Sequence, residues 1–397
     1  MPSARPSNAT TPTAAASGGP ESSTDPAAIY AAIAAQVEQI RDLRPKADVT
    51  PALLDADQLR ANLTADFDRN NPPALVAVTQ GLYIELGLLP QGGSLRTAYL
   101  DLEAGQVAGY YSADDKRLFV VSRSGGVGPT QRVTYAHEFT HQLQDQNFDL
   151  SKLGLDATDQ GDRSLGRLAL VEGDAVTTQT TWMTSNLNST DLAQLLSDAS
   201  DPAALAALQA APAILRTTVL FPYTSGATFV QKLMAAGGLQ AVDAAFADPP
   251  DSTAQVLHPE LYASRTKPIA INLPATLAAS LGSGWRLLGE DTLGELQIRG
   301  WLTADGVDGA TAATAAAGWA GDRVAILAGP SGQLALAMVI RWSTSTDVTE
   351  FATAYGGITA KLGGPSSYDG TLGDDMISIA IAPSVHLDQI LYDDLHP

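Results

Sequence analysis

Two of the five histidines in this chain of 397 residues lie four positions apart, in the segment HEFTH at residues 137–141. Four helical residues turn through about 400°, so a helix here would place His137 and His141 on one face. Glu138 lies where its carboxylate can reach a water held beside both imidazoles. This H-E-x-x-H arrangement indicates a metal site with Glu138 as general base. The competing interpretation is an amphipathic helix whose histidines are exposed or hydrogen bonded.

The surrounding sequence favours a helix for this segment. The preceding loop SGGVGPTQ is rich in glycine and ends in Pro129 and Thr130, so a helix can begin near residue 130. Before that loop, QVAGYYSADDKRLFVVSR has two β-rich runs separated by a polar turn at Asp114 and Asp115. A strand hairpin is therefore predicted before the metal helix.

Composition limits the ligands and the partners of such a site. The chain has no cysteine, so a metal must be held by His, Asp or Glu, which suits zinc. The formal net charge of −20 argues against nucleic acid, because phosphate binding needs clustered Lys and Arg. The longest apolar runs are far shorter than the ~18 residues of a membrane helix, so no transmembrane segment is expected.

A third ligand is needed to complete the site. The metzincin pattern is disfavoured because Gln144 and Asn147 occupy the positions of its glycine and third ligand. Downstream, RLALVEGDAV offers Glu172 as a lone carboxylate in an apolar helical stripe, and a metal would offset the cost of burying it. Gly173 supports this choice, since glycine inside a helix is best explained by close approach of another helix. Asp149, in the loop after the motif, is the rival ligand.

Several segments resemble a known family. HEFTH followed by Asp145 resembles the active-site helix of thermolysin-like gluzincins, and VEGDA resembles the third-ligand helix of gluzincin aminopeptidases. YAHEFTHQLQDQNFDL, LALVEGDAV, FPYTSGATFV and STAQVLHPELY, within residues 107–262, are similar to segments of a largely uncharacterised group of exported bacterial and archaeal candidate metallopeptidases.

The resemblance implies Zn²⁺ held by His137, His141 and Glu172, with Glu138 as base. It also implies a peptide or protein substrate that lies against the strand at residues 118–121 as an added β-strand.

The chain also departs from the thermolysin pattern. Glu172 follows His141 by 31 residues (172 − 141), so LSKLGLDATDQGDRSLGRL is expected to form an inserted loop. Val176 stands where thermolysin-like enzymes place an aspartate. Asp145 shares a helix face with His141 and is the better candidate partner for that ligand, whereas Asp174 is expected to face another helix or solvent.

Hydrolysis of an amide also needs a donor for the developing oxyanion. FPYTSGATFVQKL predicts a helix that begins after Pro222, with Tyr223 at its N-terminus. DSTAQVLHPELY begins with a capping box and ends a short helix at His258. His258 is the leading candidate donor, with Tyr223 and Tyr262 as alternatives. Each of them could instead be a packing residue.

The rest of the chain sets the organisation. Residues 1–25 are rich in Ser, Thr, Pro and Ala and are expected to be a flexible tether, and residues 26–268 a zinc metallopeptidase-like domain. Residues 269–397 alternate predicted helices and strands and are expected to form an accessory α+β domain. Two further histidines, His386 and His396, are expected to be exposed.

The sequence therefore predicts an α+β protein with a mostly helical gluzincin-like core, a small antiparallel hairpin before the metal helix, and a C-terminal α+β domain. The predicted function is zinc-dependent peptide-bond hydrolysis by a secreted or envelope-attached metallopeptidase, with residues 1–25 as a possible membrane tether. The alternative is a catalytically silent protein of the same fold that acts as a binding or structural module. The presence of both Glu138 and Glu172 speaks against that alternative, and hydrolysis of a non-peptide amide is a third reading.

Overall fold

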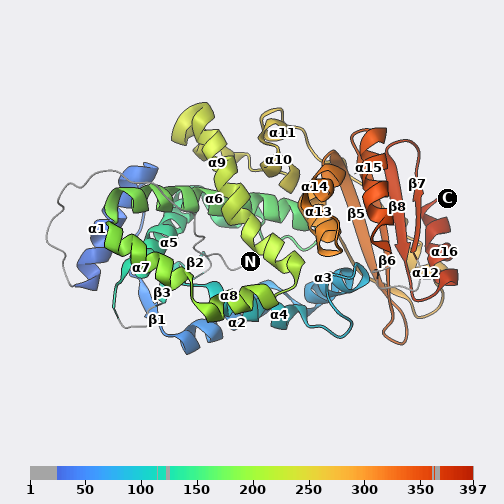
Figure 1. The fold of residues 1–397 in the computed structure, drawn as a ribbon, viewed down its shortest axis with the longest axis horizontal. Coiled ribbons are helices and arrows are strands. Elements are labelled where there is room, and N and C mark those ends of the chain that lie inside the picture. The colour runs from blue at the N-terminus through green and yellow to red at the C-terminus, as the bar shows by residue number, and fades with distance from the viewer. Residues whose placement is uncertain (1–24, 114, 122–125, 360–361, 363–366, 397) are drawn as a thin grey trace.

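A computed structural model describes residues 25–113, 115–121, 126–359, 362 and 367–396. It has the predicted α+β fold, with a largely helical part that carries a small sheet and a larger sheet at the opposite end of the molecule (Figure 1). Apart from Asp25, the predicted tether lies outside the described residues, as does Asp114 of the predicted turn.

The helices of the N-terminal half are α1 (Pro26–Arg41), α2 (Ala56–Asn70), α3 (Pro73–Glu85), α4 (Leu95–Gln106), α5 (Pro129–Phe148), the 3₁₀ helix η1 (Leu150–Leu153), α6 (Gly161–Asn186), α7 (Ser189–Ala199) and α8 (Pro202–Ala210). Those that follow are α9 (Ala213–Ala247), α10 (Thr253–Leu257), α11 (Pro259–Ala263), α12 (Leu277–Ser280), α13 (Gly294–Ala304), α14 (Gly309–Ala316), α15 (Ser345–Gly356) and α16 (Val385–Leu395). The strands are β1 (Ala52–Leu54), β2 (Gly109–Ser112), β3 (Arg117–Val121), β4 (Arg286–Asp291), β5 (Trp319–Ala328), β6 (Leu334–Trp342), β7 (Ser367–Thr371) and β8 (Met376–Ile381).

The small sheet has the strand order β1-β3-β2. β2 and β3 form the predicted antiparallel hairpin, with Tyr110 opposite Phe119, while β1 pairs with β3 in parallel. The prediction that residues 118–121 form the edge strand is wrong, because β3 is flanked on both sides. The edge of this sheet that lies beside α5 is β2.

The helix that carries the HEFTH segment is α5, which begins with Pro129 as predicted. The next α-helix, α6, begins at Gly161 and carries Glu172. The predicted inserted loop is therefore too long, since only residues 149–160 separate the two helices, and η1 occupies part of that interval. The last part of the predicted loop, from Gly161 onward, is the first part of α6, the helix that carries Glu172.

Helix α9 packs along α6 and completes the helical part. It begins at Ala213 and contains Pro222, so the prediction of a helix starting after Pro222 is wrong. The helix bends later, at Gly237 and Gly238, where the backbone leaves helical geometry. The predicted short helix is present as α10, which ends before His258.

The larger sheet has the order β4-β5-β6-β8-β7, and all of its pairs are antiparallel. Helices α3, α13, α14 and α15 contribute to the hydrophobic core on one face, and α12 and α16 to the core on the other. Val78 and Leu82 of α3 share their cluster with Trp301 and Ile326, so one core joins residues on both sides of position 268.

Two further outcomes concern chain ends and membranes. His386 is exposed as predicted, but His396 is half-buried, because its ring is hydrogen bonded to Tyr392 and Ser378. Among the described residues, no single helix is long and apolar enough to cross a bilayer; the pair α8 and α9, bent by 117°, passes that test only when taken together.

Candidate metal centre

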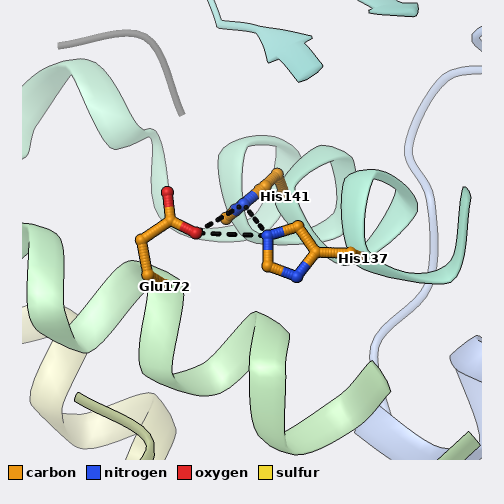
Figure 2. A group of neighbouring side chains, drawn as sticks. All are labelled: His137, His141 and Glu172. Atoms are coloured by element: carbon orange, nitrogen blue, oxygen red, sulfur yellow. Dashed lines mark hydrogen bonds and ion pairs between the residues drawn. The ribbon is translucent and has the colours of Figure 1, made fainter. Parts of the chain in front are cut away.

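His137, His141 and Glu172 converge in the interior of the helical part (Figure 2). The Nε2 atoms of the two histidines lie 3.0 Å apart, and Oε2 of Glu172 lies 3.2 Å from Nε2 of His137 and 3.3 Å from Nε2 of His141. The three side chains are buried. Helices α5 and α6 therefore bring together the three residues that the sequence proposed as ligands, and the group could hold a metal ion.

Charge is concentrated in this buried group. Burial opposes the charged form of His141, but Glu172 and Glu138 outweigh it and raise the pKa of His141 to about 9. Burial likewise opposes ionisation of Glu172, yet the two imidazoles outweigh it and lower its pKa to about 2. For His137, burial dominates and the pKa is lowered. A carboxylate thus remains ionised in an apolar interior, which a bound cation would stabilise further.

Glu138 lies between the ligand group and strand β2. Its carboxylate accepts a hydrogen bond from the backbone N–H of Tyr111 and interacts electrostatically with His141 and Glu172. Burial, reinforced by the negative charge of Glu172, raises its pKa well above the usual value. Its Oε2 atom has no hydrogen-bond partner among the described residues, so one oxygen is available to a water or a substrate.

The backbone approach that allows this contact depends on Gly109. A Cβ at Gly109 would lie 2.5 Å from Cγ2 of Thr134 on α5 and 2.6 Å from the carbonyl oxygen of Phe119. Only glycine lets β2 come this close to α5 without displacing it. Tyr111, two residues later, is thereby brought to Glu138.

Each ligand histidine is also held through its second ring nitrogen. Nδ1 of His137 is 2.8 Å from Oε1 of Gln179, and Nδ1 of His141 is 2.9 Å from Oε1 of Gln144. The prediction that Asp145 would be the partner of His141 is therefore wrong. Sequence reasoning missed Gln144 and Gln179 because neutral amides carry no charge signal, although Gln144 lies three residues after His141 and can reach it on the same helix.

Asp145 instead links α5 to β2 and to the turn just before β3. Its Oδ2 accepts a hydrogen bond of 2.8 Å from the hydroxyl of Tyr111 and one of 2.7 Å from Nζ of Lys116. Tyr111 is consequently held at two points along α5, by its backbone at Glu138 and by its side chain at Asp145. The strand beside the candidate base is fixed in place by this pair of contacts.

Asp174 faces another helix, as predicted, and its partner is Arg41 of α1. Both side chains are buried, and Nε of Arg41 lies 2.7 and 2.8 Å from the two carboxylate oxygens. Arg41 also contacts Asp243 of α9 at 2.6 Å. One guanidinium therefore ties α1, α6 and α9 together directly behind the metal ligands.

The prediction that Gly173 marks a close helix approach is confirmed. A Cβ at Gly173 would lie 2.2 Å from the carbonyl oxygen of Gly226 on α9, and a Cβ at Gly226 would lie 2.2 Å from that of Ala169. Because both positions lack a side chain, α6 and α9 touch backbone to backbone next to Glu172. The same approach brings the ring of Tyr223 onto His137, with ring centroids 6.2 Å apart.

A cavity of about 190 Å³ opens beside His141. Its lining includes Tyr110 to Ala113, at the end of β2 and just after it, together with Leu150 and Leu155. Leu168 and Val171 of α6 line its floor. Of the three proposed ligands, His141 lines this cavity, together with β2, which is an edge strand of the small sheet among the described residues.

The other proposed donors are not brought to this group. His258 is hydrogen bonded through Nε2 to Glu295 of α13 at 2.8 Å and is about one-third exposed. Tyr262 is buried, and its hydroxyl donates to the backbone carbonyl of Asp248. Of the three candidates, only Tyr223 contacts a ligand of the metal centre.

Comparison with known proteins adds one match. The model of a domain of unknown function (DUF8575) matches residues 285–383, which span β4 to β8 and leave the candidate metal centre outside the match. No curated protein and no solved structure matches the chain.

Proposed function

We propose that the chain is a zinc-dependent peptidase of the gluzincin type, in which His137, His141 and Glu172 hold the metal. The observation that carries the proposal is the placement of Glu138, whose free carboxylate oxygen is buried beside three convergent ligand atoms. A metal-storage or purely structural site would have no use for a base in that position. The H-E-x-x-H spacing supports the same chemistry.

The ligand atoms fit a zinc ion. Zn–N and Zn–O bonds of 2.0–2.2 Å in a tetrahedron separate neighbouring ligand atoms by roughly 3.3–3.6 Å. The three atoms here lie 3.0–3.3 Å apart, so small outward shifts would complete three corners of such a site. Two imidazoles and one carboxylate without a thiolate form a donor set that zinc accepts in catalytic sites.

When bound, zinc would act as a Lewis acid that activates water and polarises the substrate carbonyl. The protein residues supply the proton transfers and the alignment. Glu138 takes a proton from the attacking water and delivers it to the leaving amine. Tyr111 orients Glu138 through its backbone N–H. Tyr223, stacked on His137, is the donor we assign to the developing oxyanion.

The cleft suggests how a peptide would bind. Among the described strands, β2 pairs with β3 alone, and β2 lines the cavity beside His141. An extended peptide could hydrogen bond to this free edge, with alternate side chains directed into the cavity. This replaces β3 with β2 as the proposed substrate-binding strand.

The decisive experiment compares the wild-type protein with Glu138→Gln in a peptide-library digest read by mass spectrometry. Glu138→Gln keeps the shape of the side chain and should keep zinc, but it removes the proton acceptor, so cleavage should fall by ~10² to 10⁴. Asp149→Asn, at the C-cap of the same helix with its side chain 44% exposed, is the matched control and should cleave normally. Zinc binding without cleavage by either the wild type or Glu138→Gln would instead favour a catalytically silent binding module.

A further inference from the structure

Gln144 joins a metal ligand to a buried ion pair. Its Oε1 lies 2.9 Å from Nδ1 of His141, and its Nε2 donates to the carbonyl oxygen of Val171 and to Oδ2 of Asp174, both at 2.9 Å. The side chain is fully buried. The three contacts use the amide oxygen and both amide hydrogens, so this glutamine is completely engaged.

The orientation of this amide follows from its surroundings. The end that faces Val171 and Asp174 meets a carbonyl oxygen and a carboxylate oxygen, and both of these only accept hydrogen bonds. That end must therefore be the NH₂ group. If the amide turned over, its oxygen would face two other acceptors in a buried place, at a cost of several unmade hydrogen bonds.

The fixed amide determines which nitrogen of His141 carries a proton. Since the oxygen of Gln144 faces Nδ1, Nδ1 must donate, so whenever the ring is neutral its lone pair lies on Nε2, which points toward His137 and Glu172. We propose that Gln144 is the positioning residue that holds His141 in its Nδ1-protonated, ligand-ready form, and that Asp174 with Arg41 keeps the Gln144 amide from turning over. The inference rests on the proposed function in that it assumes Nε2 to be a metal ligand.

Arg41 fixes the orientation of the Asp174 carboxylate that accepts the hydrogen bond from Gln144. The guanidinium lies 2.7 and 2.8 Å from the two oxygens of Asp174, and both groups are buried. A guanidinium only donates hydrogen bonds, so both carboxylate oxygens of Asp174 are held in the role of acceptors. Arg41 comes from α1, so a helix far from the motif in sequence sets the state of a metal ligand.

His137 offers an internal contrast. Its Nδ1 is 2.8 Å from Oε1 of Gln179, but among the described residues the amide nitrogen of Gln179 donates only to the sulfur of Met183, at 3.8 Å. A thioether is a weak acceptor and imposes little on the amide. The orientation of Gln179 therefore depends on His137 itself, whereas that of Gln144 is imposed from behind.

The first test is nuclear magnetic resonance of the metal-free protein labelled with ¹⁵N-histidine. In the wild type, the proton on Nδ1 of His141 should be observed and slow to exchange with water, because it is buried and donated to Gln144. In Gln144→Met the new side chain has a similar volume but no strong hydrogen-bond acceptor. The Nδ1 proton should then exchange with water too fast to be observed. Gln142→Met, which replaces another buried glutamine of α5, should leave it unchanged.

Asp174→Asn provides a second variant. An asparagine amide can present its own NH₂ group to Gln144, which would relieve the bias on the Gln144 amide. The Nδ1 proton of His141 should then exchange faster, while that of His137 stays as in the wild type. A general loosening of the helices would affect both histidines alike and would contradict the assignment.

Zinc affinity gives an independent measurement, by competition with a chelator. Partners of ligand histidines typically contribute 10- to 100-fold to metal affinity, so Gln144→Met should lose that factor and Gln142→Met should not. A wild-type affinity for zinc that Gln144→Met leaves unchanged, together with an unchanged Nδ1 proton, would overturn the inference and leave the proposed function standing. A wild-type protein that binds no zinc would overturn the proposed function, while the proton measurement would still decide the role of Gln144.

Discussion

The contact between α6 and α9 can be tested by adding a single methyl group at Gly173. The new Cβ would lie 2.2 Å from the carbonyl oxygen and 2.3 Å from the carbonyl carbon of Gly226. Ordinary contacts begin near 3.4 Å, so the two helices would have to separate by about 1 Å. Both atoms belong to the backbone, and no side-chain rotation can relieve the overlap.

Two effects oppose each other in Gly173→Ala. Alanine favours the helix over glycine by ~1 kcal/mol, whereas overpacking of a tight contact costs ~1–3 kcal/mol and can cost more. Because the obstacle is backbone, we expect the overpacking cost to be about 3 kcal/mol, the upper end of that range. The free energy of unfolding should then fall by about 2 kcal/mol net. A 1 Å shift of α6 would also displace Glu172, and zinc affinity should fall at least ~10-fold, since ligand positions tolerate only ~0.5 Å.

The assay is urea unfolding of the metal-free protein combined with chelator competition for zinc. Gly300→Ala in α13 is the matched control, because its Cβ would meet only side-chain atoms, the nearest being Cδ1 of Ile214 at 3.1 Å. That variant should equal or exceed the wild type in stability. If Gly173→Ala were as stable as Gly300→Ala and bound zinc normally, the reasoning from the close approach would be refuted.

Three further predictions concern other groups. Burial raises the pKa of Glu85 to about 7, so the native state binds the extra proton between pH 4.5 and 7, and the free energy of unfolding falls as pH rises through that window. Glu85→Gln should therefore exceed the wild type by up to about 3 kcal/mol in urea unfolding at pH 8 and match it at pH 4.5. The hydrogen bond that His258 donates to Glu295 raises the pKa of His258, so its stabilising contribution is present at low pH and is lost as pH rises through the raised pKa. His258→Ala should be destabilised at pH 6, near wild type at pH 9, and unchanged in kcat. Tyr223→Phe keeps the ring on His137 but removes the hydroxyl, and kcat should fall by ~10²-fold with zinc affinity unchanged.

These three predictions can each fail separately. Parallel stability curves for Glu85→Gln and the wild type across pH would exclude the burial argument. A lowered kcat in His258→Ala would return that residue to the site, and full activity of Tyr223→Phe would leave the oxyanion without its assigned donor.

The sequence identified the parts of the site that depend on local spacing. His137 and His141 share a helix face by periodicity alone, and Glu172 stood out as a charge within an apolar stripe. Gly173 was interpretable because a helix rarely tolerates glycine without a packing reason. In each case the relevant distance is set within a single helix or by the absence of a side chain.

The parts that depend on distant contacts were missed or misassigned. Asp145 was assigned to His141 because the two share a helix face, but Tyr111 and Lys116 of the hairpin reach it first. The family resemblance implies that strand 118–121 is the edge, and the three-residue β1, which pairs with it in parallel from far upstream, gives no periodic signal that would correct this. The proline at 222 predicts the start of a helix, but α9 begins at Ala213 and continues through Pro222.

The larger sheet followed the same pattern. The segments DRVAILAG, QLALAMVIRW and DMISIAIAP predict strands and correspond to β5, β6 and β8, whereas β4 and β7, at the two edges of the sheet, are not predicted. Helix α3 packs against this sheet through Val78 and Leu82, a contact between segments more than 200 residues apart that no local pattern could indicate.

The central claim is that two imidazoles and the carboxylate of Glu172 bind zinc, and that the neighbouring Glu138 is not a ligand of the metal. The most direct measurement is the zinc content and affinity of the wild type, Glu172→Ala and Glu138→Gln under identical conditions. The wild type and Glu138→Gln should each bind about one zinc per chain with similar affinity, and Glu172→Ala should lose most of that affinity. Equal zinc binding by Glu172→Ala and the wild type would contradict the claim.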